Sequence, residues 1–199
     1  MAASAEHGGG ERPILTLDFD GVICMPPFGT NLGIRRRLID PHAEPERAFV
    51  PPRWFGGPAD HLRFAFRRPA EEARSALERL AETRRLVILT GRRSSPDRWL
   101  RRHGLDQLIE RVMINDGPHG SAHYKLRCVN ELGAAEHIDD DGPTAQLLAD
   151  RSAARVYLRD WPRNRGLAYS DGVTRVHDLA SLASRLASGE RAQGRGSSD

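Results

Sequence analysis

Cysteine, lysine and long apolar segments are all scarce in this chain of 199 residues. The two cysteines, Cys24 and Cys128, are too few for a disulfide framework or a zinc knuckle, which favours a reducing compartment and predicts a cytoplasmic protein. No segment approaches the roughly 18 apolar residues that a membrane span needs, and residues 1–10 lack the basic-then-apolar order of a signal peptide. We therefore expect no membrane partner.

Lysine is nearly absent from the basic residues, because Lys125 is the one lysine among 30 lysines and arginines. In a chain so rich in arginine, a retained lysine indicates a position that needs a compact ammonium rather than a planar guanidinium. The net charge of +3 is small. The arginines are spread along the chain between acidic residues, so a solvated surface is the better interpretation and nucleic acid is not expected as a partner.

The composition, with 39% hydrophobic and 29% charged residues, is that of a globular domain with a modest insertion. We predict disordered tails at residues 1–12 and 188–199, and a core formed by residues 13–23 and 69–187. Residues 24–68 carry many prolines and half of the twelve aromatic residues, without regular periodicity. Such a stretch is typical of a lid or binding loop, and we expect a small cap here. The alternative is an insertion whose aromatic residues only form a core of their own.

Apolar segments of strand length alternate with amphipathic segments of helix length. This pattern predicts a Rossmann-like α/β fold, in which helices cover both faces of a parallel sheet. The expected strands are 13–19, 85–91, 111–115, 135–141 and 154–158, and the expected helices are 70–83, 95–104, 122–132, 143–150 and 178–187.

Three of the expected strands end in groups that can carry chemistry. The first ends in Asp18 and Asp20, the second in Thr90-Gly91, and the fourth in the run 139–141, which is Asp-Asp-Asp. Because ligands bind outside the carboxyl ends of the strands in such sheets, we expect these groups to converge on one edge. Crowded carboxylates raise each other's pKa, and a shared Mg²⁺ relieves that repulsion. The predicted metal ligands are Asp18, Asp20, Asp139 and Asp140.

A phosphate ester at this edge would meet a complete set of reacting groups. Asp18 is placed to attack phosphorus and form an aspartyl-phosphate, and Asp20 to protonate the leaving oxygen and later take a proton from water. Thr90, Gly91 and Lys125 are expected to hold the phosphate oxygens.

Asp-Phe-Asp-Gly-Val-Ile at residues 18–23, Leu-Thr-Gly-Arg at 89–92, Lys125 and Ile-Asp-Asp-Asp at 138–141 occur in this order. With these four motifs in this order, the chain resembles the haloacid dehalogenase-like (HAD) superfamily. The resemblance implies a Rossmann-like core, Mg²⁺ dependence, a cap between the first two motifs, and, because of Asp20, a phosphatase or phosphomutase. Residues 159–165 and 175–177 resemble the tail of its deoxyribonucleotidase-like branch.

The hypothesis that follows is a Mg²⁺-dependent phosphatase acting on a small phosphomonoester, with a nucleotide or a sugar phosphate as candidate substrates. A phosphomutase or phosphotransferase with the same intermediate, and a phosphatase that processes nucleic-acid ends, remain alternatives. The order of motifs disfavours a receiver domain, in which the acidic pair precedes the phosphorylated aspartate.

Several neighbouring residues are given more ordinary roles. His137 is interpreted as a packed histidine rather than a base, and His119 and His123 as surface residues. Asp141 is expected to form the turn that starts the following helix. Trp161 and Asn164 are candidates for the wall of the site.

Overall fold

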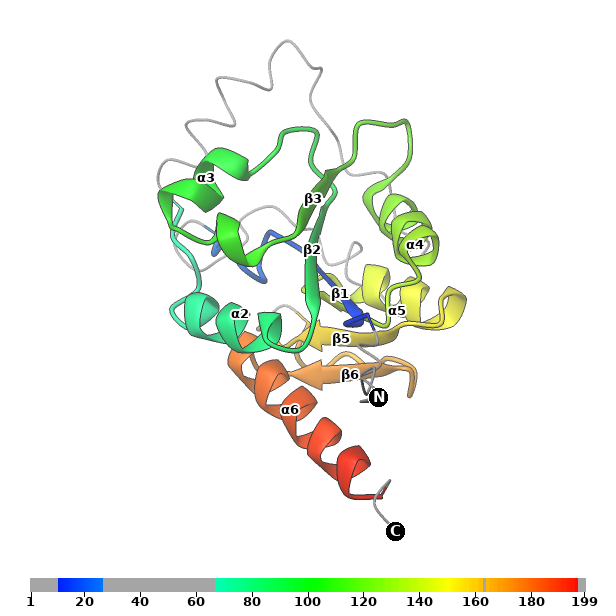
Figure 1. Cartoon of the computed structure of the whole chain (residues 1–199). Helices are drawn as coiled ribbons and strands as arrows, with labels where there is room; N and C mark the ends of the chain where they lie inside the picture. The colour runs from blue at the N-terminus through cyan, green and yellow to red at the C-terminus, as the bar shows by residue number, and fades with distance from the viewer. Residues whose placement is uncertain (1–10, 27–66, 163, 197–199) are drawn as a thin grey trace, which may run out of the picture.

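The computed structural model describes residues 11–26, 67–162 and 164–196, and for residues 190–196 the backbone alone. The predicted cap at 24–68 and the predicted N-terminal tail therefore lie almost wholly outside the described residues. Figure 1 shows a central sheet with helices on both of its faces. The predicted Rossmann-like α/β fold is confirmed.

Six parallel strands form the sheet in the order β3-β2-β1-β4-β5-β6. They are β1 (Ile14–Leu17), β2 (Arg85–Thr90), β3 (Arg111–Ile114), β4 (Glu136–Asp139), β5 (Arg155–Arg159) and β6 (Val173–Val176). The helices are α2 (Ala73–Ala81), α3 (Asp97–Arg102), α4 (Ser121–Leu132), α5 (Gly142–Arg151) and α6 (Leu179–Gly196), with a short 3₁₀ helix η3 (Asp106–Leu108) before β3. Among the described helices, none has the length and apolar content to cross a membrane.

The side chains of β2 divide the core between the two faces of the sheet. Leu86 and Ile88 pack on one face with the apolar sides of α2, α3 and α6. Val87 and Leu89 pack on the other face with α4 and α5. A strand covered on both faces must be apolar at consecutive positions, which explains why the strands read as continuous apolar runs.

The helix ends follow the local sequence. Gly133 ends α4 in the left-handed conformation with φ 57°, which glycine adopts without a steric penalty. Asp141 caps α5, because its side chain accepts a hydrogen bond of 3.1 Å from the backbone amide of Thr144, and Pro143 lies in the first turn. The prediction that Asp141 starts this helix is confirmed.

Two elements differ from the sequence-based expectation. Strand β6 was not predicted, because Val-Thr-Arg-Val is short and half-exposed at the edge of the sheet, and it becomes a strand only by pairing with β5. The helix end predicted at residue 187 is too early, because α6 continues to Gly196 within the segment expected as a tail. Alanine, glutamate, arginine and glutamine in residues 187–193 favour helix and outweigh the single Gly189.

Candidate active site

The switch point of the strand order lies between the neighbouring strands β1 and β4. From β1 the sheet grows through β2 to β3 on one side, whereas β4 lies on the other side of β1. In open α/β sheets this switch point is where loops separate and ligands bind. Leu17 pairs with Ile138, so the next residues, Asp18 and Asp139, lie side by side at the carboxyl ends of the two strands.

Asp18, Asp139 and Asp140, which we call the acid group, gather at this point. One carboxylate oxygen from each residue lies within 4.8 Å of the others. All three are buried, with exposed fractions of 6%, 0% and 5%. Gly21 leaves space for Asp140, since a Cβ at Gly21 would lie 1.8 Å from Oδ2 of Asp140, and its φ of 75° also favours glycine.

Lys125 connects α4 to the acid group. Its Nζ lies 2.8 Å from Oδ1 of Asp18 and 2.8 Å from Oδ2 of Asp139. Burial alone would lower the pKa of Lys125, but the two carboxylates outweigh it and raise the pKa above its usual range. The lysine is therefore a fixed positive charge, and its buried position leaves it in contact with two acids at once.

The carboxylates of the acid group are affected in opposite directions. Burial raises the pKa of Asp18 well above its ordinary value, and the neighbouring acids raise it further, whereas Lys125 opposes them. Burial also acts to raise the pKa of Asp139, but Lys125 and His137 outweigh it and lower the pKa. One ammonium thus does not neutralise three buried carboxylates, and the ionised form of Asp18 remains unfavourable.

The acid group fits a hard divalent cation. Mg²⁺ prefers oxygen ligands and is commonly bound through carboxylates, and the three acids offer one oxygen each at close range. A divalent cation would also supply the positive charge that Lys125 alone does not provide. The donor set therefore suits Mg²⁺ at Asp18, Asp139 and Asp140.

The side chain of Asp20 lies apart from the acid group. It forms ion pairs with Arg67 and Arg92, and Nη2 of Arg92 donates to its Oδ1 at 2.8 Å. Burial alone would raise the pKa of Asp20, but the hydrogen bonds and charges of the two arginines lower it. Of the four predicted metal ligands, the structure brings together the carboxylates of three and places that of Asp20 between two cations.

Arg67 also ties together the two ends of the inserted segment. Its Nε donates to the carbonyl of Met25 at 2.8 Å, and its Nη2 to that of Cys24 at 3.4 Å. The Met25 amide in turn donates to the carbonyl of Arg68 at 3.0 Å. Arg67 had no sequence signal, because it precedes a helix and belongs to no motif. Arg92 is the last residue of the Leu-Thr-Gly-Arg motif, but the sequence indicated no role for it, because its partner Asp20 lies in the loop after β1, 72 positions earlier.

Of the predicted phosphate ligands, Thr90 is the last residue of β2, the other neighbour of β1, and Gly91 follows it in the loop. Thr90 is buried, and its Oγ1 accepts a 3.3 Å hydrogen bond from the Arg92 amide. A Cβ at Gly91 would lie 2.0 Å from Oγ of Ser121. Ser121 begins α4 one turn before Lys125, and residues four apart share a helix face. The loop after β2 and the start of α4 are therefore in close contact.

Trp161 and Asn164 support the site through its backbone. Nε1 of Trp161 donates to the carbonyl of Gly21 at 3.0 Å. The side-chain Nδ2 of Asn164 donates to the backbone carbonyls of Asp140 at 3.3 Å and Arg159 at 2.8 Å. These residues hold the two loops that carry Asp18 and Asp140, rather than contributing groups to the acid group.

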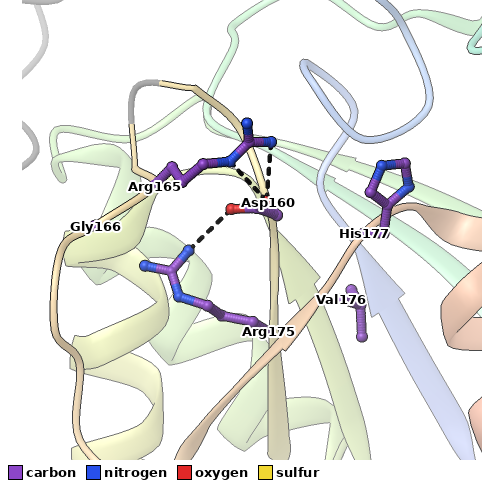
Figure 2. Close-up of a pocket in the computed structure, with 6 residues that line it drawn as sticks. All are labelled: Asp160, Arg165, Gly166, Arg175, Val176 and His177. Carbon is purple, nitrogen blue, oxygen red and sulfur yellow. Dashed lines mark hydrogen bonds and ion pairs between the residues drawn. The ribbon is translucent and has the colours of Figure 1, made fainter.

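A cavity of about 370 Å³ lies at the carboxyl ends of β5 and β6, and the loop that contains Arg165 and Gly166 forms part of its lining. Figure 2 shows Arg165 and Arg175 converging on Asp160, and their ion pairs measure 3.0 and 3.2 Å. Arg175 also donates to the carbonyls of Asn164 and Leu167. The arginines thus hold the loop together, and the cavity's lining includes no member of the acid group.

The fold is shared with solved structures of HAD-superfamily hydrolases. A HAD-superfamily hydrolase of subfamily IA from Geobacter sulfurreducens superposes with a TM-score of 0.55 and 18% identity, over 89% of this chain and 98% of that one. A HAD phosphatase from Thermococcus onnurineus superposes with a TM-score of 0.61 and 15% identity, over 87% and 97% of the two chains. A predicted phosphoglycolate phosphatase from Haemophilus somnus gives 0.56 and 14%, over 90% and 100%.

No protein-family model matches the sequence, and the search of curated proteins finds no match either. At these identities the structural likeness shows a shared fold, which agrees with the Rossmann-like core that the resemblance in the sequence implies. The deoxyribonucleotidase-like branch and the cytoplasmic location stay predictions.

Proposed function

We propose that this chain is a Mg²⁺-dependent phosphatase that hydrolyses a small phosphomonoester through an aspartyl-phosphate intermediate. The observation that carries the proposal is the meeting of Asp18, Asp139 and Asp140 at the switch point of the sheet, with Lys125 between two of them. Three buried carboxylates at a ligand-binding edge have no structural reason to be there, since apolar residues would stabilise the fold better. The fold that HAD hydrolases and phosphatases share with this chain supports the same activity.

Asp18 is the proposed nucleophile. Lys125 fixes one oxygen of its carboxylate and thereby sets the orientation of the group. When bound, Mg²⁺ would neutralise the charge of the acid group and draw the phosphate oxygens toward Asp18. The ammonium of Lys125 adds positive charge where the phosphoryl oxygens gather negative charge during transfer.

Asp20 is the proposed general acid and base. Its side chain is partly exposed, at 29%, whereas Asp18 is almost inaccessible. The two arginines lower its pKa, so without substrate Asp20 is ionised at neutral pH, which is the form that can accept a proton from water. An arriving phosphate dianion competes for the same guanidinium groups, which weakens their hold on Asp20 and favours its protonated form, the form that protonates the leaving oxygen.

Release of phosphate from p-nitrophenyl phosphate, and from a panel of phosphorylated metabolites, tests the proposal. We expect turnover with Mg²⁺, loss of turnover with excess EDTA, and recovery when Mg²⁺ is restored. The variant Asp18→Asn should fall to background, whereas Asp97→Asn, an exposed aspartate on α3, should match the wild type. Equal background rates for the wild type and Asp18→Asn on every ester would reject the activity.

A further inference from the structure

His137 lies on β4 two residues before Asp139, and its ring is wholly buried. Its two ring nitrogens face two different partners. Nδ1 lies 2.8 Å from Oγ1 of Thr16 on β1, and Nε2 lies 3.1 Å from Oδ2 of Asp139. The sequence predicted only a packed histidine here, whereas the structure places the ring in contact with the acid group.

The chemistry of the partners decides which nitrogen carries the proton. An ionised carboxylate only accepts hydrogen bonds, so Nε2 carries the hydrogen and donates to Asp139. Nδ1 of the neutral ring then accepts from the hydroxyl of Thr16. This hydroxyl also lies 3.1 Å from the carbonyl of Glu136, but the contact with Nδ1 is shorter. Asp139 therefore sets the tautomer, and Thr16 holds the ring in place from the Nδ1 side.

Asp139 is fixed at both of its oxygens. Oδ2 accepts from Nε2 of His137 and from Nζ of Lys125, and Oδ1 accepts from the amide of Asp141 at 3.0 Å. These donors come from three directions, so the carboxylate does not rotate freely about its Cβ–Cγ bond. A neutral imidazole is well suited to this task, because it donates a hydrogen bond without adding a charge that would repel a cation.

We propose that His137, held by Thr16, is a positioning residue that orients the carboxylate of Asp139 for a divalent cation. This inference rests on the proposed function, since it takes Asp139 as a metal ligand. Partners that hydrogen-bond to metal ligands fix ligand orientation, and their loss typically costs about 10- to 100-fold in metal affinity or activity. Thr16 and His137 would orient Asp139 in this way from within the sheet, where they lie on the neighbouring strands β1 and β4.

Isothermal titration calorimetry with MgCl₂ measures the binding without any substrate. We expect His137→Leu, which removes the donor, to weaken Mg²⁺ binding by about 10- to 100-fold. His137→Gln retains a side-chain N–H donor and should stay closer to the wild type. Thr16→Val removes the hydroxyl with little change of shape and should give a smaller loss. Ser152→Ala, which removes two hydrogen bonds at the end of α5, is the matched control and should bind like the wild type.

The Mg²⁺ concentration that gives half-maximal phosphatase activity should rise most in His137→Leu and less in Thr16→Val and His137→Gln. The KM for the ester at saturating Mg²⁺ should stay near that of the wild type in all three variants. Asp139→Asn distinguishes the two proposals. If the wild type binds Mg²⁺, Asp139→Asn loses it, and His137→Leu and Thr16→Val bind as the wild type does, the role of His137 is overturned and the proposed function stands. If His137→Leu does not fold, wild-type Mg²⁺ affinity in Thr16→Val overturns the role, because the proposal requires a loss in that variant. A wild type that does not bind Mg²⁺ overturns both.

Discussion

Arg92 donates a hydrogen bond of 2.8 Å from Nη2 to Oδ1 of Asp20, and Arg67 forms an ion pair with the same carboxylate from the opposite end of the inserted segment. The proposed acid–base residue is thus held by two cations that come from different parts of the chain. This arrangement couples the protonation of Asp20 to two arginines that lie outside its own motif at residues 18–23.

The first prediction concerns the pH dependence of catalysis. Arg92 and Arg67 lower the pKa of Asp20, so Arg92→Gln should raise it. Where kcat/KM depends on protonated Asp20, the alkaline limb of its pH profile should move to higher pH in this variant. Arg101→Gln, an exposed arginine on α3, should leave the profile in place. An unmoved alkaline limb in Arg92→Gln would argue against Asp20 as the acid.

A second prediction concerns stability without metal. Because the pKa of Asp18 is raised in the folded protein, its ionised form destabilises the fold once the pH rises above the unfolded value of about 3.9. Asp18→Asn should therefore unfold a few degrees higher than the wild type in EDTA at pH 7.5. This gain should shrink as the pH is lowered and the wild-type carboxyl becomes protonated.

Millimolar Mg²⁺ should reverse that comparison. The wild type gains stability by binding the ion, whereas Asp18→Asn has lost one ligand and gains less. Thermal unfolding followed by circular dichroism, with and without Mg²⁺, measures both effects. Equal Mg²⁺-induced shifts in the two proteins would show that Asp18 does not bind the ion.

A third prediction separates the charge of Lys125 from its shape. Lys125→Met removes the ammonium that contacts Asp18 and Asp139, and the rate should fall by about 10²–10³, as for the loss of other groups that stabilise a developing charge. Lys125→Arg keeps the charge, but a planar guanidinium does not fit a buried position built around a compact head group. We expect little recovery of kcat in this variant. Recovery to the wild-type rate would mean that charge alone is sufficient.

A fourth prediction compares two glycines with similar backbones. Gly21 has φ 75°, and a Cβ there would lie 1.8 Å from Oδ2 of Asp140. Gly133 has φ 57°, and a Cβ there would meet nothing within 4 Å. Both alanine variants should lose about 1 kcal/mol from the backbone conformation. Gly21→Ala should in addition weaken Mg²⁺ binding, whereas Gly133→Ala should bind Mg²⁺ like the wild type. Calorimetric titration and thermal unfolding of the two variants give the comparison.

The regular part of the fold could be predicted from the sequence because its signals are local. Continuous apolar runs at residues 86–89 and 156–158 identified β2 and β5, and Gly133 marked the end of α4. The edge strand β6 escaped prediction, since a four-residue strand acquires its hydrogen bonds from β5 and not from its own sequence.

In the candidate site, too, some features follow from local sequence signals and others from the arrangement of the strands. The sequence by itself determined that β1 and β4 lead into acids, because a buried strand that stops in carboxylates is visible as a change from apolar to charged residues. Only the tertiary structure decided which acids meet, since the order of the strands sets Asp139 and Asp140 beside Asp18 and leaves Asp20 between Arg67 and Arg92. It also decided the role of His137, because a ring in the middle of a strand reads as packing until the neighbouring strand places Thr16 against it. Contacts between residues more than a hundred positions apart depend on how strands are ordered, and no local pattern encodes that order.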